Sequence, residues 1–397
     1  MEPTTILILA DESAGWEIAG LSQLDRLTVA LDELTQSIGP EAKLNVVIFW
    51  KPDLPTFGRW LPRHPKIKRV RLTESLKALQ PGTRIINTHV FVDRGGLSDF
   101  FRVTPLIKVE EEVVESPSSW NQLAQRFEAT FRTTSRVPGP AWQYLETPAN
   151  IRTCENRILR GSAKSQDGLV SKFINRPISR SVTRVLLKYD IDPIAWTMAI
   201  FLLPLIAFFF LVGGDYVGTV IGAALFQLYS ILDGCDGEIA RAKYLESYRG
   251  ERIDDLFDML GSVLYVIGLG LGLMRTRASI YAAEGVLCAL IIVANEWLLR
   301  SSQSETVRLS APLAETLYSR HRQLVQNWPL SLLNEKYVRW LIQLTKRDVA
   351  IFVFLVLALA NCAQWILHLW LAVSAVILTL SGTTYLARRG RVPGSHL

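Results

Sequence analysis

Residues 226–258 read FQLYSILDGCDGEIARAKYLESYRGERIDDLFD and place a cluster of carboxylates where a membrane helix is expected. The flanking stretches Phe226–Leu232 and Leu256–Leu273 are strongly apolar. Carboxylates are costly to place beside hydrocarbon, so a group of them in this setting indicates a functional site. The residues that recur at helical spacing are Asp233, Asp236, Gly237, Ala240, Arg241, Gly250, Asp254 and Asp258.

Two helix faces collect these residues. Those from Asp233 to Arg241 recur at i, i+3, i+4, i+7 and i+8, and those from Gly250 to Asp258 recur at i, i+4 and i+8. Two helices would therefore bring four carboxylates together, and the small residues would leave room for a bulky ligand against the backbone. Asp255 lies about 100° from the second face and is left out. Asp255 and Glu238 are also consistent with capping a helix end or facing water.

The residue types indicate a metal site. Carboxylate oxygens are the hard ligands that Mg²⁺, Mn²⁺ and Ca²⁺ prefer. Four clustered acids without a metal would repel one another unless some stayed protonated, and one or two divalent ions resolve this. A carboxylate-bound metal with an arginine at its rim suits a phosphate or diphosphate substrate. The chemistry indicated is displacement at phosphorus.

The spacing Asp-x2-Asp-Gly-x2-Ala-Arg-x8-Gly-x3-Asp-x3-Asp resembles the signature of the CDP-alcohol phosphotransferases, with every fixed position present. The resemblance implies a six-helix membrane fold, usually homodimeric. It implies transfer of a phosphoalcohol group from a CDP-linked alcohol to an acceptor hydroxyl, with release of CMP. Carried over by position, Asp233, Asp236 and Asp254 would hold Mg²⁺ or Mn²⁺, and Asp258 would be a metal neighbour and the base. The CDP site would be lined by Gly237, Ala240, Arg241 and Gly250.

Composition divides the chain into a soluble and a membrane part. The 397 residues carry a net charge of +6, and the mean hydropathy is +0.21. Residues up to about 190 read as soluble and the rest as membrane. No signal peptide is expected, because Ile6–Ala10 is too short an apolar run. Six spans are predicted at Pro193–Gly213, Val217–Leu232, Leu256–Met274, Ile280–Leu299, Val349–Ile366 and Leu369–Leu386.

Basic residues set the expected orientation. They crowd before the first span, between the second and third, between the fourth and fifth, and after the sixth. The positive-inside rule then places both termini and the motif on the cytoplasmic side, and we expect the plasma membrane. Arg275 and Arg277 are the exception. Membrane lipids and a second copy of the chain are expected partners, and no nucleic acid is expected.

A basic stripe precedes the first span, at Lys172, Arg176, Arg180, Arg184 and Lys188. Apolar residues lie between them, so the stretch predicts an amphipathic helix on an anionic membrane surface. A second basic pair, Lys346-Arg347, is either an interfacial anchor or, by resemblance to relatives, a site for a phosphate on the acceptor, with Arg347 the candidate. The stretch Ala311–Thr345 predicts interfacial helices at the cytoplasmic entrance.

The N-terminal half predicts an α/β domain with a mostly parallel sheet. Ile6–Ala10 and Leu44–Trp50 read as buried strands joined by a helix, and Arg84–Val92 offers another strand. We expect an α/β domain at 1–150, a linker with the amphipathic helix at 151–192, and the membrane domain at 193–390. The element order resembles the sugar-nucleotidyltransferase-like domain of archaeal bifunctional inositol-phosphate cytidylyltransferase fusions.

The first loop argues against catalysis by this N-terminal domain. It contains Asp11, Glu12 and Glu17 and no lysine or arginine, whereas a triphosphate needs amide donors and cations. Asn87 to Asp93 stands where a metal-binding aspartate is expected, and Asp93 is the alternative ligand. We therefore predict an inert domain. The competing hypotheses are a bifunctional enzyme with an active cytidylyltransferase, a membrane prenyltransferase and an ion-coupled transporter. The fusion favours an inositol-phosphate or related polar acceptor.

Overall fold

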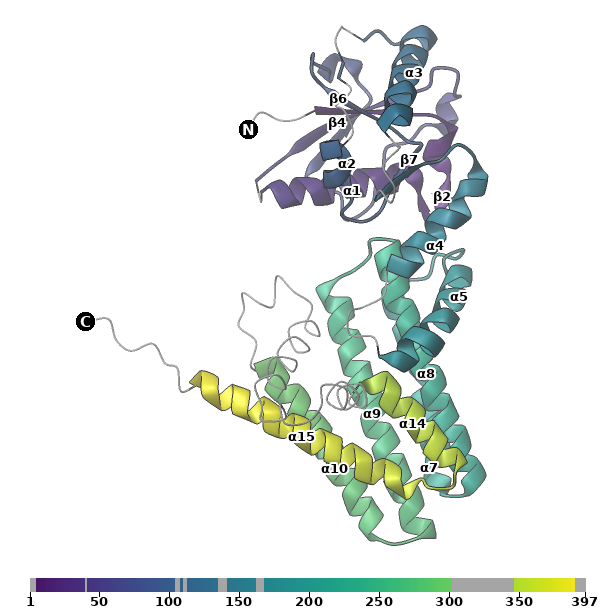
Figure 1. Ribbon diagram of the computed structural model, residues 1–397, viewed down its shortest axis with the longest axis vertical. Coiled ribbons are helices and arrows are strands. Elements are labelled where there is room, and N and C mark those ends of the chain that lie inside the picture. Colours follow the sequence, from purple (N-terminus) through teal and green to yellow (C-terminus); the bar gives the residue numbers. More distant parts are fainter. Residues whose placement is uncertain are drawn as a thin grey trace, which may run out of the picture. The chain divides into compact units, whose positions relative to one another are not determined.

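The computed structural model describes residues 5–39, 41–103, 108–109, 113–134, 141–161, 168–301 and 346–389 (Figure 1). They divide into two units. The first is Met1–Ser162 with Leu187–Asp190 and Ala240–Leu245, and the second is Ala163–Leu186, Ile191–Ile239 and Glu246–Leu397. The predicted interfacial helices at Ala311–Thr345 lie outside the described residues.

A four-stranded parallel sheet forms the centre of the first unit. Its strand order is β5 (Val70–Thr73), β4 (Leu44–Trp50), β1 (Thr5–Ala10) and β6 (Arg84–Asn87). β1 and β4 pair over their full length, from Thr5 opposite Asn45 to Ala10 opposite Trp50. Both strands are near-continuous apolar runs, as expected for parallel strands buried on both faces. The predicted β-α-β unit is confirmed, with α1 (Gln23–Ile38) between these strands.

Shorter elements complete this unit. Helix α1 and helix α3 (Pro117–Thr134) flank the sheet (Figure 1). Two small antiparallel pairs lie beside it, β2 (Glu17–Ile18) with β3 (Leu21–Ser22) and β7 (Val90–Val92) with β8 (Trp142–Tyr144). The helices are α2 (Leu97–Val103), α3 (Pro117–Thr134) and α4 (Ile151–Gly161). The 3₁₀ turns are η1 (Glu12–Gly15), η2 (Thr56–Gly58), η3 (Leu76–Ala78) and η4 (Pro148–Asn150).

The predicted strand Arg84–Val92 is wrong as a single strand. The chain leaves the main sheet after Asn87, whose side-chain oxygen accepts a hydrogen bond from the His89 amide at 3.0 Å. A hydrogen bond from a backbone amide to the side-chain oxygen of an asparagine two residues earlier stabilises a turn. The chain then resumes as β7 in a separate antiparallel pair. A local side-chain contact therefore ends the strand within an apolar run.

Helices make up the second unit. They are η5 (Ser171–Asn175, a π-helical turn), α5 (Arg176–Leu186), α6 (Pro193–Ile200), α7 (Leu202–Gly213), α8 (Tyr216–Ala242), α9 (Tyr248–Thr276), α10 (Ile280–Ser301), α14 (Arg347–Leu359) and α15 (Gln364–Arg389). Within the described part of the chain, four stretches are long and apolar enough to cross a membrane. They are Pro193–Gly213, Tyr216–Ala242, Tyr248–Thr276 and Ile280–Leu298.

The predicted fifth span, Val349–Ile366, is not one helix. Helix α14 ends at Leu359, and Asn361 adopts a left-handed conformation with φ of 57°. The Asn361 amide donates to the Ala358 carbonyl, and the Cys362 amide donates to the Leu357 carbonyl at 2.8 Å. This pair of bonds is the Schellman ending of a helix, which asparagine tolerates. The predicted sixth span falls inside α15, so the total of six spans stays a prediction.

Glycines allow the long helices to approach closely. A Cβ on Gly272 of α9 would lie 2.0 Å from the Leu211 carbonyl oxygen of α7, and one on Gly270 would lie 2.8 Å from the Tyr281 carbonyl oxygen of α10. Small residues at helix contacts are typical of packing in a membrane, where backbones gain van der Waals contact by approaching. Helix α9 is thereby fixed between α7 and α10, and α9 carries part of the acidic motif.

Candidate metal and phosphotransfer site

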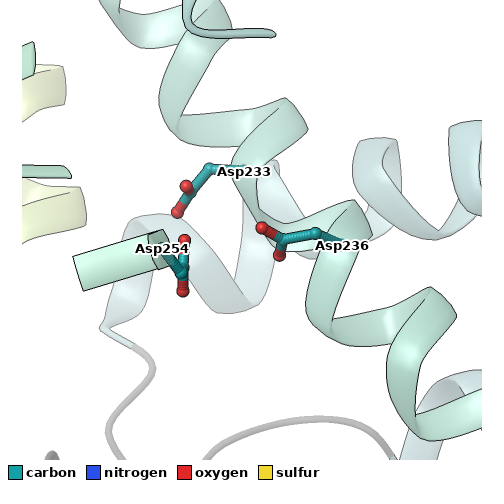
Figure 2. Close-up of side chains that lie close together, drawn as sticks. All are labelled: Asp233, Asp236 and Asp254. Carbon is teal, nitrogen blue, oxygen red and sulfur yellow. The ribbon is translucent and has the colours of Figure 1, made fainter. Parts of the chain in front are cut away.

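Three of the motif carboxylates meet in the second unit. Asp233 and Asp236 lie on α8 and Asp254 lies on α9, with one oxygen from each within 4.8 Å of the others (Figure 2). Asp236 is buried and the other two are half-buried. The spacing of three residues on α8 puts its two aspartates on one face. No other group of three or more potential ligands occurs among the described residues.

The donor set of this carboxylate trio fits a divalent ion. Three carboxylates supply hard oxygen ligands and negative charge but no nitrogen or sulfur, the combination that suits Mg²⁺ or Mn²⁺ rather than zinc or copper. The start of α9 is fixed by Ser247, whose side chain accepts a hydrogen bond from the Gly250 amide at 3.0 Å. This cap sets the helix that presents Asp254. The predicted metal ligands are thus brought together.

The fourth aspartate, Asp258, lies outside this trio and has two polar partners of its own. The Tyr229 hydroxyl donates to Asp258 Oδ1 at 3.0 Å, and Arg347 Nη1 forms an ion pair with Oδ2. Arg347 Nη1 also lies 3.9 Å from Asp233 Oδ2. The predicted base and the predicted acceptor-phosphate residue are therefore neighbours in space. Tyr229 was not a predicted site residue, although it lies four residues before Asp233 on the same helix.

The predicted CDP-binding residues lie on the same two helices. Gly237, Ala240 and Arg241 follow the metal ligands along α8 and are half-buried. Gly250 lies in the first turn of α9, where a Cβ would be 3.2 Å from Ser247 Oγ and 3.7 Å from Ile194 Cγ1. Gly250 therefore lies beside the first turn of α6.

Glu238, which in the sequence is also consistent with capping a helix or facing water, is fully buried. Its carboxylate accepts hydrogen bonds from Arg176 Nη1 at 3.1 Å, Ser179 Oγ at 2.8 Å and Thr183 Oγ1 at 2.7 Å. These donors lie on one face of α5. Glu238 is two residues from Asp236, about 200° around α8, so α5 docks on the side of α8 away from the metal face. The structure therefore excludes this alternative for Glu238, because its partners come from another helix.

The basic side chains of the stripe differ in burial. Arg176 is buried against Glu238, whereas Lys172 and Lys188 are exposed. The exposed side of this segment carries apolar side chains, including Phe173, with 69% of its surface accessible, and Val185, with 54%. The helix is amphipathic, as predicted. However, Arg176 of the stripe points inward to Glu238 and does not add to the basic outer surface.

Asp348 connects the start of α14 to the segment before α5. Its Oδ2 accepts a hydrogen bond from the Ser171 amide at 2.6 Å. A Cβ on Gly168 would lie 2.3 Å from Asp348 Oδ1, so only glycine fits there without movement. Asp348 follows Arg347 directly, and its anchoring therefore fixes the backbone from which Arg347 reaches Asp258.

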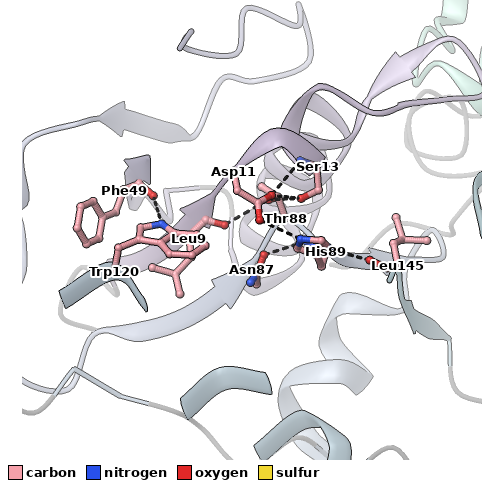
Figure 3. Close-up of polar contacts among 9 residues, drawn as sticks. All are labelled: Leu9, Asp11, Ser13, Phe49, Asn87, Thr88, His89, Trp120 and Leu145. Carbon is pink, nitrogen blue, oxygen red and sulfur yellow. Dashed lines mark hydrogen bonds and ion pairs between the residues drawn. The ribbon is translucent and has the colours of Figure 1, made fainter. Parts of the chain in front are cut away.

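A separate polar network lies in the first unit, where β1 and β6 end side by side (Figure 3). The chain leaves β1 for β4 on one side and later crosses from β5 to β6 on the other side, so the strand order reverses here, and ligands of open α/β sheets bind at such places. Here Asp11 Oδ2 lies 2.9 Å from His89 Nε2, and His89 Nδ1 lies 2.5 Å from the Leu145 carbonyl oxygen. Ser13 donates to Asp11 Oδ1 from both its amide and its hydroxyl. The position is therefore occupied by an internal ion pair.

This pair is electrostatically self-consistent. Burial opposes the charge on His89, but the hydrogen bond and attraction of Asp11 raise the pKa of His89 overall. Burial likewise opposes the charge on Asp11, yet His89 and Ser13 lower the pKa of Asp11 overall. Both imidazole nitrogens face acceptors, as expected for the protonated ring. Asp93, the alternative metal ligand, is bonded to Arg157 Nη2 at 2.5 Å.

Comparisons with known proteins agree with the motif. Residues 193–380 match the family model described as CDP-alcohol phosphatidyltransferase. A protein named bifunctional IPC transferase and DIPP synthase from Rubrobacter xylanophilus is 35% identical over 177 residues, which are 44% of this chain and 40% of that protein. The protein of the same name from Archaeoglobus fulgidus is 27% identical over 254 residues, 63% of this chain and 45% of that protein. The protein of that name from Thermococcus kodakarensis is 32% identical over 161 residues, which are 40% of this chain and 35% of that protein.

The predicted resemblance is confirmed, because the C-terminal part of the chain matches the CDP-alcohol phosphatidyltransferase family model. The similarity to the fusion enzymes is confirmed as well, through relatives that are named bifunctional. The chain spans less than half the length of these curated relatives. A membrane prenyltransferase and an ion-coupled transporter receive no support from these comparisons.

Proposed function

We propose that this chain is an integral-membrane CDP-alcohol phosphotransferase. It transfers a substituted phosphate from a CDP-linked alcohol to an acceptor hydroxyl and releases CMP, in the synthesis of phospholipids or polar phosphodiesters. The observation that carries the proposal is the meeting of Asp233, Asp236 and Asp254 within 4.8 Å, inside a region that matches this family.

In the proposed mechanism the trio holds Mg²⁺ or Mn²⁺, which when bound neutralises diphosphate charge. Asp258 accepts the proton of the acceptor hydroxyl, whose oxygen attacks the phosphorus that bears the alcohol. The bond from that phosphorus to the bridging oxygen breaks, and CMP leaves with the electron pair. Tyr229 orients Asp258 through its hydroxyl. Gly237, Ala240, Arg241 and Gly250 line the nucleotide site.

Arg347 is our candidate for a phosphate on the acceptor. Its guanidinium lies between Asp258 and Asp233, with 38% of the side chain exposed, so an incoming anion has access to it. Arginine matches phosphate geometry with paired donors. The relatives are named bifunctional IPC transferase and DIPP synthase. We therefore favour an inositol-phosphate or related polar acceptor.

The membrane assembly is part of the proposal. We propose a six-helix domain at 193–390, preceded by an N-terminal domain at 1–150 and by a linker with the amphipathic helix at 151–192. The motif and both termini face the cytoplasm at the plasma membrane, the chain forms a homodimer among membrane lipids, and two metal ions are bound. The basic loops and the family resemblance support this arrangement.

The N-terminal domain is proposed to be inert as a nucleotidyltransferase. The Asp11–His89 pair and the acidic first loop offer no cationic cradle for a triphosphate. A second candidate is a bifunctional enzyme with an active cytidylyltransferase, which the names of the relatives favour.

A CMP-release assay tests the proposed activity. The purified full chain is supplied with CDP-alcohol and acceptor pairs, including an inositol phosphate, with Mg²⁺ or with excess EDTA. We expect CMP release that needs both acceptor and metal. Full activity in excess EDTA, or absence of CMP release with every pair, would contradict the proposal.

A further inference from the structure

Two adjacent side chains of α6 contact the turn of α8 that carries the metal carboxylates. The Thr197 hydroxyl donates to Asp236 Oδ2 at 2.6 Å, and the Trp196 indole nitrogen donates to the Leu232 carbonyl at 3.1 Å. Thr197 and Asp236 are buried, with 3% and 7% of their surfaces exposed. Helix α6 therefore braces both the backbone just before Asp233 and the side chain of Asp236.

The hydroxyl of Thr197 favours Asp236 over its other acceptor. The Pro193 carbonyl lies 3.1 Å away, but the hydroxyl has one hydrogen, and the carboxylate oxygen is nearer and charged. The start of helix α6 is well defined. The Asp192 side chain accepts a hydrogen bond from the Ala195 amide at 3.0 Å, and Pro193 occupies the first helical position. The donor is thus held on a fixed backbone.

We propose that Thr197 is a positioning residue of the metal site. This inference rests on the proposed function. Its hydroxyl binds one oxygen of Asp236, while the Gly237 amide bonds the other. These two bonds fix the rotation of the Asp236 carboxylate. The carboxylate is thereby held toward the carboxylates of Asp233 and Asp254. Groups that orient a metal ligand in this way commonly change metal affinity or activity by about 10- to 100-fold when removed.

Metal binding is the direct test, because it does not depend on turnover. Mn²⁺ is titrated into the purified full chain, and free Mn²⁺ is followed by electron paramagnetic resonance. We expect Thr197→Val to weaken Mn²⁺ binding by about 10- to 100-fold, and Thr197→Ser, which keeps the hydroxyl, to bind within a few fold of wild type. Thr219→Val is the matched control, since Thr219 is also buried on α8 but about 25 Å along that helix from Asp236.

The outcomes separate this inference from the proposed function. Equal Mn²⁺ affinity in wild type and Thr197→Val overturns the role of Thr197 and leaves the function standing. Absence of Mn²⁺ binding in wild type contradicts the metal-dependent function itself. Melting curves in EDTA check that each variant is folded. Should the valine variant not fold, Thr197→Ala is titrated in the same way, and wild-type affinity in that variant overturns the inference.

Discussion

The aspartates of the motif differ from one another in their surroundings. Asp236 is buried and bonded by Thr197, whereas Asp233 and Asp254 are half-buried beside it. Asp258 is held instead by Tyr229 and Arg347. A ligand of the metal and a base for the acceptor would therefore respond differently to substitution, although all four are carboxylates of one motif.

We predict a split between binding and turnover at these positions. Asp233→Ala, Asp236→Ala and Asp254→Ala should lose both Mn²⁺ binding and CMP release, because each removes a ligand. Asp258→Asn should keep most Mn²⁺ and CDP-alcohol binding but lower the rate by about 100-fold or more, since a base contributes that much. Asp255→Asn is the control and should be mild. Near-normal turnover in Asp258→Asn would remove Asp258 from the role of base.

Spacing along the chain identified the motif residues but not their partners. The eight fixed positions lie on two helices, so periodicity alone predicts that they share faces. Thr197 lies 39 residues from Asp236, and Arg347 lies 89 residues from Asp258. Tertiary packing decides which of many threonines and tyrosines meets a carboxylate. Arg347 was found from sequence only through the resemblance to relatives.

Among the elements, α5 is attached to α8 by polar contacts instead of an apolar face. Glu238 is enclosed by three donors from α5, and Cys235 Sγ donates to the Ser179 carbonyl at 3.5 Å. A Cβ on Gly234 would lie 3.2 Å from Arg176 Nη1, so a larger residue there would crowd the arginine that bonds Glu238. Breaking a buried ion pair costs about 3–5 kcal/mol, because it leaves a charge poorly compensated.

Glu238→Ala should therefore loosen α5 from α8. The readout is alkylation of Cys235, which is fully buried in the intact protein, followed by mass spectrometry of its peptide. We expect faster alkylation in Glu238→Ala and partial protection in the double variant Arg176→Met with Glu238→Leu, which replaces the pair by apolar groups. Ser181→Ala, on the exposed side of α5, should leave the rate unchanged. An unaltered rate in Glu238→Ala would show that the pair does not hold the helix.

Element boundaries were less predictable than element types. The apolar run Val349–Ile366 satisfies a hydropathy window, yet Asn361 ends α14 within it by a left-handed turn. Likewise, Arg84–Val92 is apolar enough for one strand but is divided by the turn at Asn87. In both cases a single asparagine stabilises a backbone conformation that hydrophobic pattern does not register. The second, third and fourth predicted spans and the two central strands had no such interruption, and each lies within a single helix or strand of the structure.

In the molecule as a whole, the two units differ in the polar groups that they contain. The first unit contains the Asp11–His89 ion pair, which is sensitive to pH. The raised pKa of His89 means that its contribution to stability is present below its unfolded pKa and is lost as pH rises through the folded value. The lowered pKa of Asp11 means that its contribution is present above its unfolded pKa and is lost as pH falls through the folded value. The pair should therefore stabilise most between about pH 4 and pH 6.5.

Hydrogen exchange checks this pH dependence in the full chain. After correction for the intrinsic rate, the peptide over β7 should be better protected near pH 5.5 than near pH 8, because His89 loses its proton on the way. In His89→Gln this difference between the two pH values should disappear. A wild-type protection that does not vary with pH would show that the pair contributes no stability.

Whether the whole chain carries out one reaction or two depends on the N-terminal unit. A cytidylyltransferase must hold CTP, and the place where β1 and β6 end side by side is filled by Asp11, His89 and Ser13. The adjoining loop is acidic, and Asp93 is engaged by Arg157. We therefore expect the full chain to release no pyrophosphate from CTP with an inositol phosphate or another polyol phosphate. The assay uses Asp236→Ala, so that phosphotransfer does not consume a CDP-product. Pyrophosphate release from this variant that is abolished by Asp11→Asn or His89→Gln would establish a second active site at this sheet edge and favour the bifunctional enzyme.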